Sequence, residues 1–226
     1  MKANIGPSGG NVKIYLDSAD LDDVTAASRL AFVHGVTTNP SLMRVVTKDP
    51  LKHAGELLAS TTLMDFYYQP SGAYSSLLDE AEAAWSLDPQ RVILKLPSTA
   101  TGIRVAKGLT DRGIRVALTA AQTPNAMIAA EAIGCHAVIP YVDRAWRDPR
   151  VGSGLVADLA KVRRGTTQIV AASVKNVGQF TQAFVDGADA VTAPLDVLEQ
   201  VLNHPAALEA ELAFADEYRA DLPMRR

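Results

Sequence analysis

Residues 102–118, GIRVAKGLTDRGIRVAL, contain the helix–strand unit from which the fold is predicted. The stretch 102–112 has helical character, Gly113 follows it, and the short apolar run 115–118 comes next. A glycine just past a helix favours the left-handed conformation that ends the helix. The same order recurs in AIGCHAVI (132–139) and VDGADAVT (185–192), so the chain is predicted to repeat a helix–strand unit.

Eight short apolar runs are predicted to be strands. Each run is apolar on both sides of the pleat, which is typical of strands covered by helices. The runs are 12–16, 36–37, 63–68, 92–96, 115–118, 137–139, 168–172 and 190–192. The segments predicted to be helices are 20–31, 77–86, 102–112, 123–133, 153–163 and 179–186. Gly35, like Gly113, is predicted to end a preceding helix.

The repeated units predict an α/β protein with a (β/α)₈ TIM barrel. Eight strand–helix units at intervals of roughly 20–30 residues are the pattern of that closed barrel. An open doubly wound sheet is the alternative, but it usually has a glycine-rich turn after its first strand, and here that turn is DSAD (17–20). Because no linker interrupts the pattern, we expect one domain over 12–226 with a C-terminal helical tail, preceded by a disordered lead over 1–11.

The composition excludes several classes of protein. Of the 226 residues, 48% are hydrophobic and 21% are charged, and the formal net charge is −3. One cysteine, Cys135, excludes an internal disulfide framework, and the four histidines have no metal-ligand spacing. An acidic pI of about 5.8 and the absence of a long apolar run give no reason to expect nucleic acid or a membrane as partner. We therefore expect a cytoplasmic protein without a metal.

Polar and ionisable residues follow several of the predicted strands. In a barrel the functional side chains come from the C-terminal ends of the strands, which converge on one mouth. The candidates at these positions are Asp17, Thr37, Thr38, Asn39, Gln69, Lys95, Thr119, Tyr141, Arg144, Ser173, Lys175 and Asp196.

Lys95 is the most informative candidate because it interrupts the apolar strand VILKLP (92–97). Burial disfavours the ammonium form and lowers the pKa, which makes a lysine able to form a Schiff base with a carbonyl. Alternatively, the side chain extends outward to solvent or pairs with a carboxylate.

The other candidates have simple alternatives too. Asp17 could move protons near a lysine adduct, or it could cap a helix. Tyr141 could act as acid or base, or it could be a packed tyrosine. Arg144 and Lys175 suit a phosphate group but could equally be solvated, and Gln69 could orient a water or hold the turn before Pro70.

Assembled in order, these segments resemble the small transaldolase family, within it the fructose-6-phosphate aldolase-like branch. The matching strings include YLDSADLDDV (15–24), GVTTNPSLM (35–43), VILKLPST (92–99), IPYVDR (139–144), IVAASVKN (169–176) and TAPLDVLEQVLNHPA (192–206). They cover nearly the whole chain. The resemblance implies a (β/α)₈ barrel and a Schiff-base mechanism without metal or organic cofactor.

The resemblance also implies roles for individual residues. Lys95 matches the Schiff-base lysine and Asp17 the carboxylate of the first strand. Thr119 and Gln69 match the pair that positions a catalytic water. The expected substrate-binding residues are Asn39 and Thr37 for the donor, Ile139 beside the donor's hydroxymethyl end, and Arg144, Ser173 and Lys175 for the phosphate.

Two positions separate the branches of this family. Transaldolases proper carry Phe and Glu where this chain has Tyr141 and Gln69, so the chain resembles the aldolase type. Ile139 replaces a usual Ala or Ser, and Thr101 replaces a common acidic residue. The bulk of Ile139 suggests a less hydroxylated donor such as hydroxyacetone.

The predicted function is therefore that of a class I aldolase, which joins a three-carbon ketone, dihydroxyacetone or hydroxyacetone, reversibly to an aldehyde. A transaldolase is the first alternative, and a catalytically silent barrel that binds phosphosugars is the second. The expected partners are a sugar or sugar-phosphate substrate and further copies of the chain. The helical tail after Asp196 resembles the tail of relatives that form pentameric or decameric rings. Alternatively, this tail is a helix that closes the barrel of its own chain.

Overall fold

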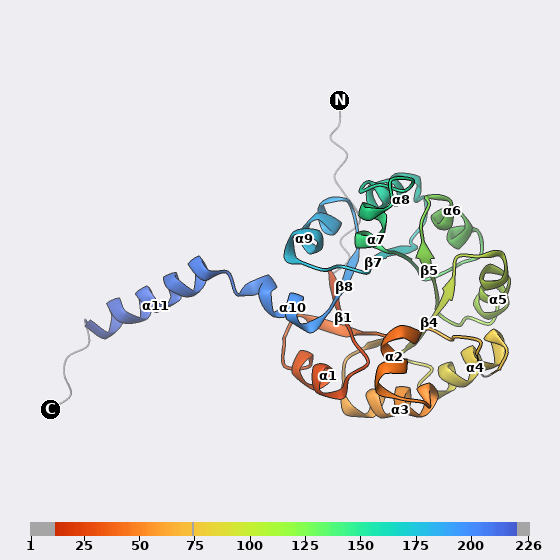
Figure 1. The fold of residues 1–226 in the computed structure, drawn as a ribbon, viewed down its shortest axis with the longest axis horizontal. Helices are drawn as coiled ribbons and strands as arrows, with labels where there is room; N and C mark the ends of the chain where they lie inside the picture. The colour runs from red at the N-terminus through yellow and green to blue at the C-terminus, as the bar shows by residue number, and fades with distance from the viewer. Residues whose placement is uncertain (1–11, 74, 221–226) are drawn as a thin grey trace.

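The computed structural model describes residues 12–73 and 75–220, in which eight parallel strands close into a barrel in chain order (Figure 1). The strands are β1 (Lys13–Asp17), β2 (Val33–Thr37), β3 (Asp65–Tyr68), β4 (Val92–Pro97), β5 (Val116–Ala121), β6 (Ala137–Pro140), β7 (Gln168–Ala171) and β8 (Ala190–Ala193). The predicted (β/α)₈ barrel is thus confirmed, and each predicted strand overlaps an observed one. The lead predicted over 1–11 lies outside the described residues.

Helices surround this barrel on its outside (Figure 1). They are α1 (Leu21–Ala27), α2 (Pro40–Val46), α3 (Pro50–Ser60), α4 (Leu77–Leu87), α5 (Ala100–Thr110), α6 (Asn125–Ala132), α7 (Val142–Arg147), α8 (Leu155–Val162), α9 (Val177–Val185) and α10 (Leu195–Leu202). A further helix, α11 (Pro205–Ala220), projects away from the barrel. The six predicted helices correspond to α1, α4, α5, α6, α8 and α9, whereas α2, α3 and α7 were not predicted. No helix of the described chain is both long and apolar enough to cross a membrane.

The strands separate the buried apolar side chains into two clusters. One cluster fills the space between the strands and the helices, and the other fills the inside of the barrel. Along β4, Ile93 belongs to the inner cluster while Leu94 and Leu96 belong to the outer one. Successive side chains of a strand alternate between faces, so Lys95 is an inward-facing residue.

Glycine serves two different purposes at the joints of the barrel. Gly113, Gly134 and Gly187 follow helices with φ values of 76°, 73° and 99°, as the helix-ending prediction requires. The same prediction is wrong for Gly35, which lies inside β2. A Cβ atom at residue 35 would stand 2.1 Å from the carbonyl oxygen of Asp65, so the close approach of β2 and β3 excludes a side chain there.

A buried carboxylate joins the N-terminal ends of three strands. Asp65 accepts hydrogen bonds from Lys13 Nζ at 3.0 Å, Tyr15 Oη at 3.0 Å and Arg115 Nη1 at 2.9 Å. Burial alone would raise the pKa of Asp65, but hydrogen bonds and charge from Lys13 and Arg115 outweigh it, and the pKa is lowered. These contacts close the end of the barrel opposite the mouth.

Replacing Asp65 with Asn is expected to lower the free energy of unfolding at pH 7 by about 3 kcal/mol, because Lys13 and Arg115 lose a buried partner. A folded-state pKa below the usual carboxyl value, about 4, gives stability that is present above that value. The difference between wild type and Asp65→Asn should therefore shrink as the pH falls through the lowered pKa. Urea unfolding at several pH values measures it.

Asp111→Asn is the matched control, since Asp111 is an exposed partner of Lys107 on α5. Its effect should be less than about 1 kcal/mol. An equal effect of the two substitutions would contradict the structural role of Asp65.

Candidate functional site

Lys95 is buried inside the barrel, near its mouth. Its residue exposure is 3%, which rules out a side chain extended to solvent. Burial lowers the pKa of Lys95 to about 8, and the negative charge of Asp17 opposes part of that shift. The uncharged amine is therefore a minor species near neutral pH, but it is far more populated than in an exposed lysine.

The amine is held by a peptide carbonyl. Lys95 Nζ donates a hydrogen bond of 2.7 Å to the carbonyl oxygen of Thr38, just beyond β2. Thr38 is itself fixed, because its amide and its hydroxyl both donate to the carbonyl oxygen of Tyr67, at 2.9 and 3.0 Å. The nitrogen is thus positioned by backbone, and none of the ion pairs recorded for the described residues includes Lys95.

Asp17 lies at the end of β1 within a chain of hydroxyl groups. Thr37 Oγ1 donates to Asp17 Oδ1 at 2.9 Å and lies 2.7 Å from Thr192 Oγ1. A hydroxyl has one proton to donate, so Thr192 must be the donor in the second bond. The carboxylate is therefore oriented from β2 and, through β2, from β8.

Thr119 and Tyr141 form a second polar pair at the mouth. Their side-chain oxygens are 3.1 Å apart, joining the end of β5 to the residue after β6. The guanidinium of Arg144 lies over the Tyr141 ring, 4.8 Å from the ring centre. Ile139, two residues before Tyr141, is buried in the inner cluster.

Asn39 and Gln69 occupy the loops after β2 and β3. The side-chain oxygen of Asn39 caps α2, accepting from the amides of Ser41 at 3.0 Å and Leu42 at 3.1 Å. This contact leaves the amide nitrogen of Asn39 as the group that could donate to a ligand. Gln69 lines a cavity of about 220 Å³ beside Met43, and its oxygen is buried without a partner in the described part of the chain.

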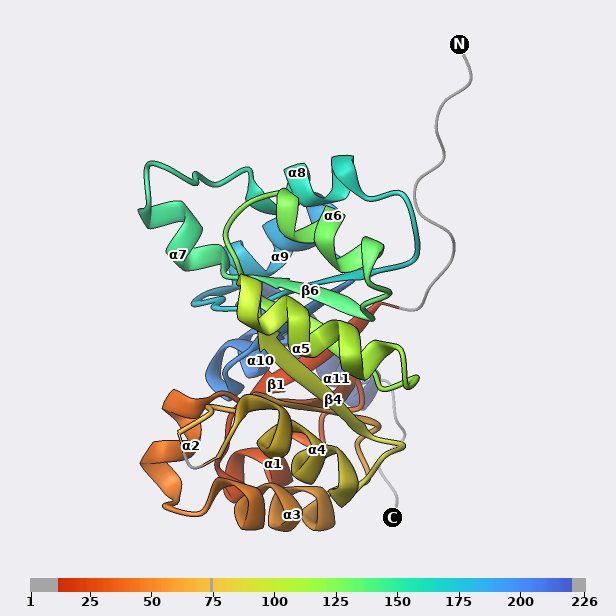
Figure 2. The same cartoon turned by 90° about the vertical axis from the view of Figure 1, so that its right-hand side faces the viewer.

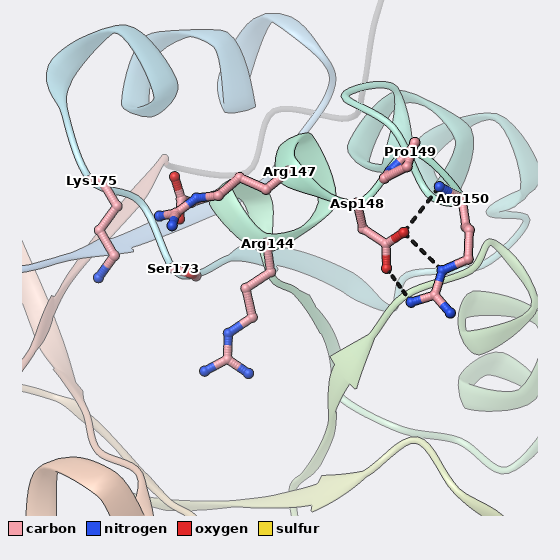
Figure 3. A pocket seen from close by; sticks show the side chains of 8 residues that line it. Arg144, Arg147, Asp148, Pro149, Arg150, Ser173 and Lys175 are labelled. Carbon is pink, nitrogen blue, oxygen red and sulfur yellow. Dashed lines mark hydrogen bonds and ion pairs between the residues drawn. The ribbon is translucent and has the colours of Figure 1, made fainter.

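Arg144, Ser173 and Lys175 line a larger open cavity of about 660 Å³ at the mouth. Two other arginines in its wall are paired, Arg147 with Asp143 and Arg150 with Asp148. Figure 3 shows the side chains of Arg144 and Lys175 directed away from these pairs. Neither takes part in an ion pair recorded for the described residues.

The loops of this mouth lie at one end of the barrel, where Figure 2 shows α2 and α7 on the same side. There the structure brings together Lys95 with the Thr38 carbonyl, Asp17 with Thr37, and Thr119 with Tyr141. It records no hydrogen bond between Gln69 and Thr119 within 12–73 and 75–220. The described residues contain no group of three or more His, Cys, Asp or Glu side chains arranged to hold a metal ion.

Comparison with known proteins gives this arrangement its context. The sequence profile described as Transaldolase/Fructose-6-phosphate aldolase matches residues 69–224, more than half of the chain. The chain belongs to this family. The predicted resemblance is thereby confirmed, as is the prediction of an enzyme of the transaldolase type.

Relatives from several bacteria support the same family over nearly the full length. A protein of Porphyromonas gingivalis named "Probable transaldolase" is 30% identical over 223 residues, covering 92% of this chain and 97% of its own. Proteins with the same name from Anaeromyxobacter sp. (strain K) and Bacteroides thetaiotaomicron are 33% and 29% identical, covering 86% and 92% of this chain and 90% and 98% of their own.

One residue of the mouth was missed in the list of candidates for this transaldolase-family chain. Thr192 carries the last hydroxyl of the chain that reaches Asp17. Its signal is a polar residue two positions after Ala190 in a predicted strand, which places it on the inner face. Thr38 was among the candidates, but it acts through its backbone carbonyl, which no side-chain pattern reveals.

Proposed function

We propose that the chain is a class I aldolase that forms a Schiff base between Lys95 and a three-carbon ketone. The observation that carries the proposal is the buried amine with a pKa lowered to about 8, held at the mouth of the barrel by the Thr38 carbonyl. A neutral amine is the nucleophilic form. Asp17 contributes the nearby charge that such a centre needs for proton movement.

In the cleavage direction, Lys95 Nζ bonds to the carbonyl carbon of the substrate, and water leaves as the iminium forms. A base takes the proton of the hydroxyl on the departing carbon, and the iminium accepts the electron pair of the breaking C–C bond. The aldehyde therefore departs and an enamine remains. Protonation of the enamine and addition of water then release the ketone and restore the amine. Asp17 is positioned to move protons on one side of the adduct.

The Thr119–Tyr141 pair supports the hydrolytic step. A phenol and a hydroxyl 3.1 Å apart can hold a water and pass a proton between it and the adduct. Gln69 is the third candidate for holding this water, since its buried oxygen lacks a partner in the described structure. The Arg144 guanidinium over the Tyr141 ring keeps the phenol in place.

Borohydride reduction in the presence of dihydroxyacetone or hydroxyacetone is expected to attach the ketone to Lys95, as located by peptide mass mapping. Lys95→Met should abolish the adduct, while Lys107→Met, which changes an exposed lysine on α5, should not. No adduct with any ketone donor would refute the Schiff base and favour a silent phosphosugar-binding barrel.

The rate of the same borohydride trapping reaction is expected to depend on pH. Because the neutral amine reacts, the initial rate of trapping should rise with pH and level off above about 8, the pKa of Lys95. A plateau reached only above pH 10, where an ordinary lysine titrates, would contradict the burial argument.

Transfer of the donor unit between sugar phosphates is the second candidate function, favoured by the name "Probable transaldolase" that the relatives carry. Tyr141 favours hydrolytic release of the ketone instead, because its phenol can donate or accept a proton and the side chain of Phe cannot. Tyr141→Phe is expected to slow release of free ketone from fructose 6-phosphate about a hundredfold. Transfer to erythrose 4-phosphate should persist.

Product assays with and without erythrose 4-phosphate measure both activities of that variant. Tyr218→Phe, on the exposed face of α11, is the control and should change neither. Equal loss of release and transfer in Tyr141→Phe would contradict the assigned division of roles.

Arg144, Ser173 and Lys175 are proposed to bind the phosphate of the aldehyde or sugar. Arginine and lysine without carboxylate partners in the recorded ion pairs suit a dianion, and they share one cavity wall. The amide nitrogen of Asn39 and the Thr37 hydroxyl are proposed to lie on the donor side, near Asp17.

Ile139 is proposed to restrict the donor. Its buried side chain on the inner face of β6 would leave a donor hydroxyl unpaired, which favours hydroxyacetone over dihydroxyacetone. Ile139→Ala should shift the ratio of kcat/KM values toward dihydroxyacetone about tenfold. Ile93→Ala, the same kind of truncation in the same inner cluster, should leave the ratio unchanged. A wild-type enzyme that prefers dihydroxyacetone would contradict the proposal.

A homo-oligomer is proposed from the C-terminal helix. Figure 1 shows α11 projecting beyond α10, and Leu208, Leu212, Phe214 and Tyr218 on it are exposed. A second copy of the chain would cover them. Sedimentation velocity should show a species several times heavier than the 24.0 kDa chain, and Leu212→Glu should shift it toward the monomer. A wild-type protein that is monomeric at micromolar concentration would refute the proposed homo-oligomer.

A further inference from the structure

The loop between β7 and α9 is held in an unfavourable backbone conformation. Ser173 has φ of +59°, a left-handed value that a residue with a side chain seldom adopts. Such a conformation persists only where the surrounding contacts determine it. Because Ser173 and Lys175 both line the large cavity, these contacts also determine the shape of the cavity wall.

Gln179 makes two of these contacts from the first turn of α9. Its side-chain oxygen accepts from the backbone amide of Lys175 at 2.8 Å, and its side-chain nitrogen donates to Asp143 Oδ1 at 3.1 Å. The residue is only 5% exposed. A single buried amide therefore spans from the β7–α9 loop to α7, the helix that carries Arg144.

Asp143 completes the link from the other side. Its backbone amide donates to the carbonyl oxygen of Ser173 at 3.2 Å, and its carboxylate also pairs with Arg147. Burial would raise the pKa of Asp143, but hydrogen bonds from Gln179 and Arg147 outweigh it, and the pKa is lowered. The carboxylate is thus an ionised acceptor for the Gln179 amide.

We propose that Gln179 is a positioning residue for phosphate recognition: its amide sets the spacing between Lys175 and Arg144 across the cavity. This inference rests on the proposed binding of a phosphorylated substrate at that cavity. The role needs an acceptor toward Lys175 and a donor toward Asp143 in one side chain. An amide offers both, whereas an ionised carboxylate offers only acceptors and an apolar chain offers neither.

Steady-state kinetics of Gln179→Met with two acceptors test the proposal. The acceptors are glyceraldehyde 3-phosphate and glyceraldehyde, which differ only in the phosphate. KM for the phosphorylated acceptor should rise about tenfold, the factor typical of losing interactions of hydrogen-bond strength. The kcat, and both constants for glyceraldehyde, should stay within about twofold of wild type.

Gln182→Met is the matched control, because Gln182 is an exposed residue one turn further along α9 and its amide contacts Asp186. It should leave all four constants unchanged. An unchanged KM for the phosphorylated acceptor in Gln179→Met would overturn the inference. Equal loss with both acceptors would also overturn it, since that result indicates a general structural role.

The wild-type enzyme tests the proposed phosphate binding separately from the role of Gln179. If wild-type enzyme does not discriminate between the two acceptors, phosphate binding at this cavity is wrong irrespective of Gln179. If Gln179→Met does not fold by circular dichroism, Gln179→Glu carries the same test, because it keeps the acceptor toward Lys175 and loses the donor toward Asp143. Its KM should then rise selectively for the phosphorylated acceptor, and the same two contrary results would overturn the inference.

Discussion

The closed barrel buries the primary amine of Lys95 close to its apolar inner cluster. Removing Lys95 from water opposes its charge, so the surroundings must supply partial compensation without restoring a fully protonated ammonium. The Thr38 carbonyl contributes a dipole at 2.7 Å, and Asp17 contributes a charge that acts without a recorded ion pair. The Lys95 amine at the mouth is thus destabilised as a cation by burial and stabilised as a cation by these two groups.

Much of the fold could be predicted because the barrel repeats a local pattern. The apolar runs and the glycines after helices are short-range signals, and they located all eight strands and six helices. The wrong interpretation of Gly35 has a long-range cause, since only the approach of Asp65 from β3 explains that glycine. The missed helices α2 and α3 begin at prolines preceded by Asn39 and Asp49 as caps, a signal that was present but not used.

The candidate site was predictable to the extent that strand ends converge. Side chains alternate between the two faces of a strand, so the positions of Asp17, Lys95 and Thr119 in β1, β4 and β5 predict that all three point toward the barrel axis. Contacts made between loops were not predictable in this way. Gln179 bonds to Asp143 across 36 positions of the chain. Its place three residues after the cap Asn176 marks a helix start, but that local signal does not reveal the contact with Asp143. The partner to which such a polar side chain bonds depends on how the loops of the mouth pack in the folded chain.

The hydroxyl bond between Thr37 and Thr192 spans 155 positions and includes the last strand of the barrel. Because β8 also pairs with β1, the support of Asp17 is complete only after the C-terminal quarter of the chain has been synthesised and docked. Contacts of such high sequence separation form late in folding. An emerging chain would therefore complete the orientation of the Asp17 carboxylate only as its barrel closes.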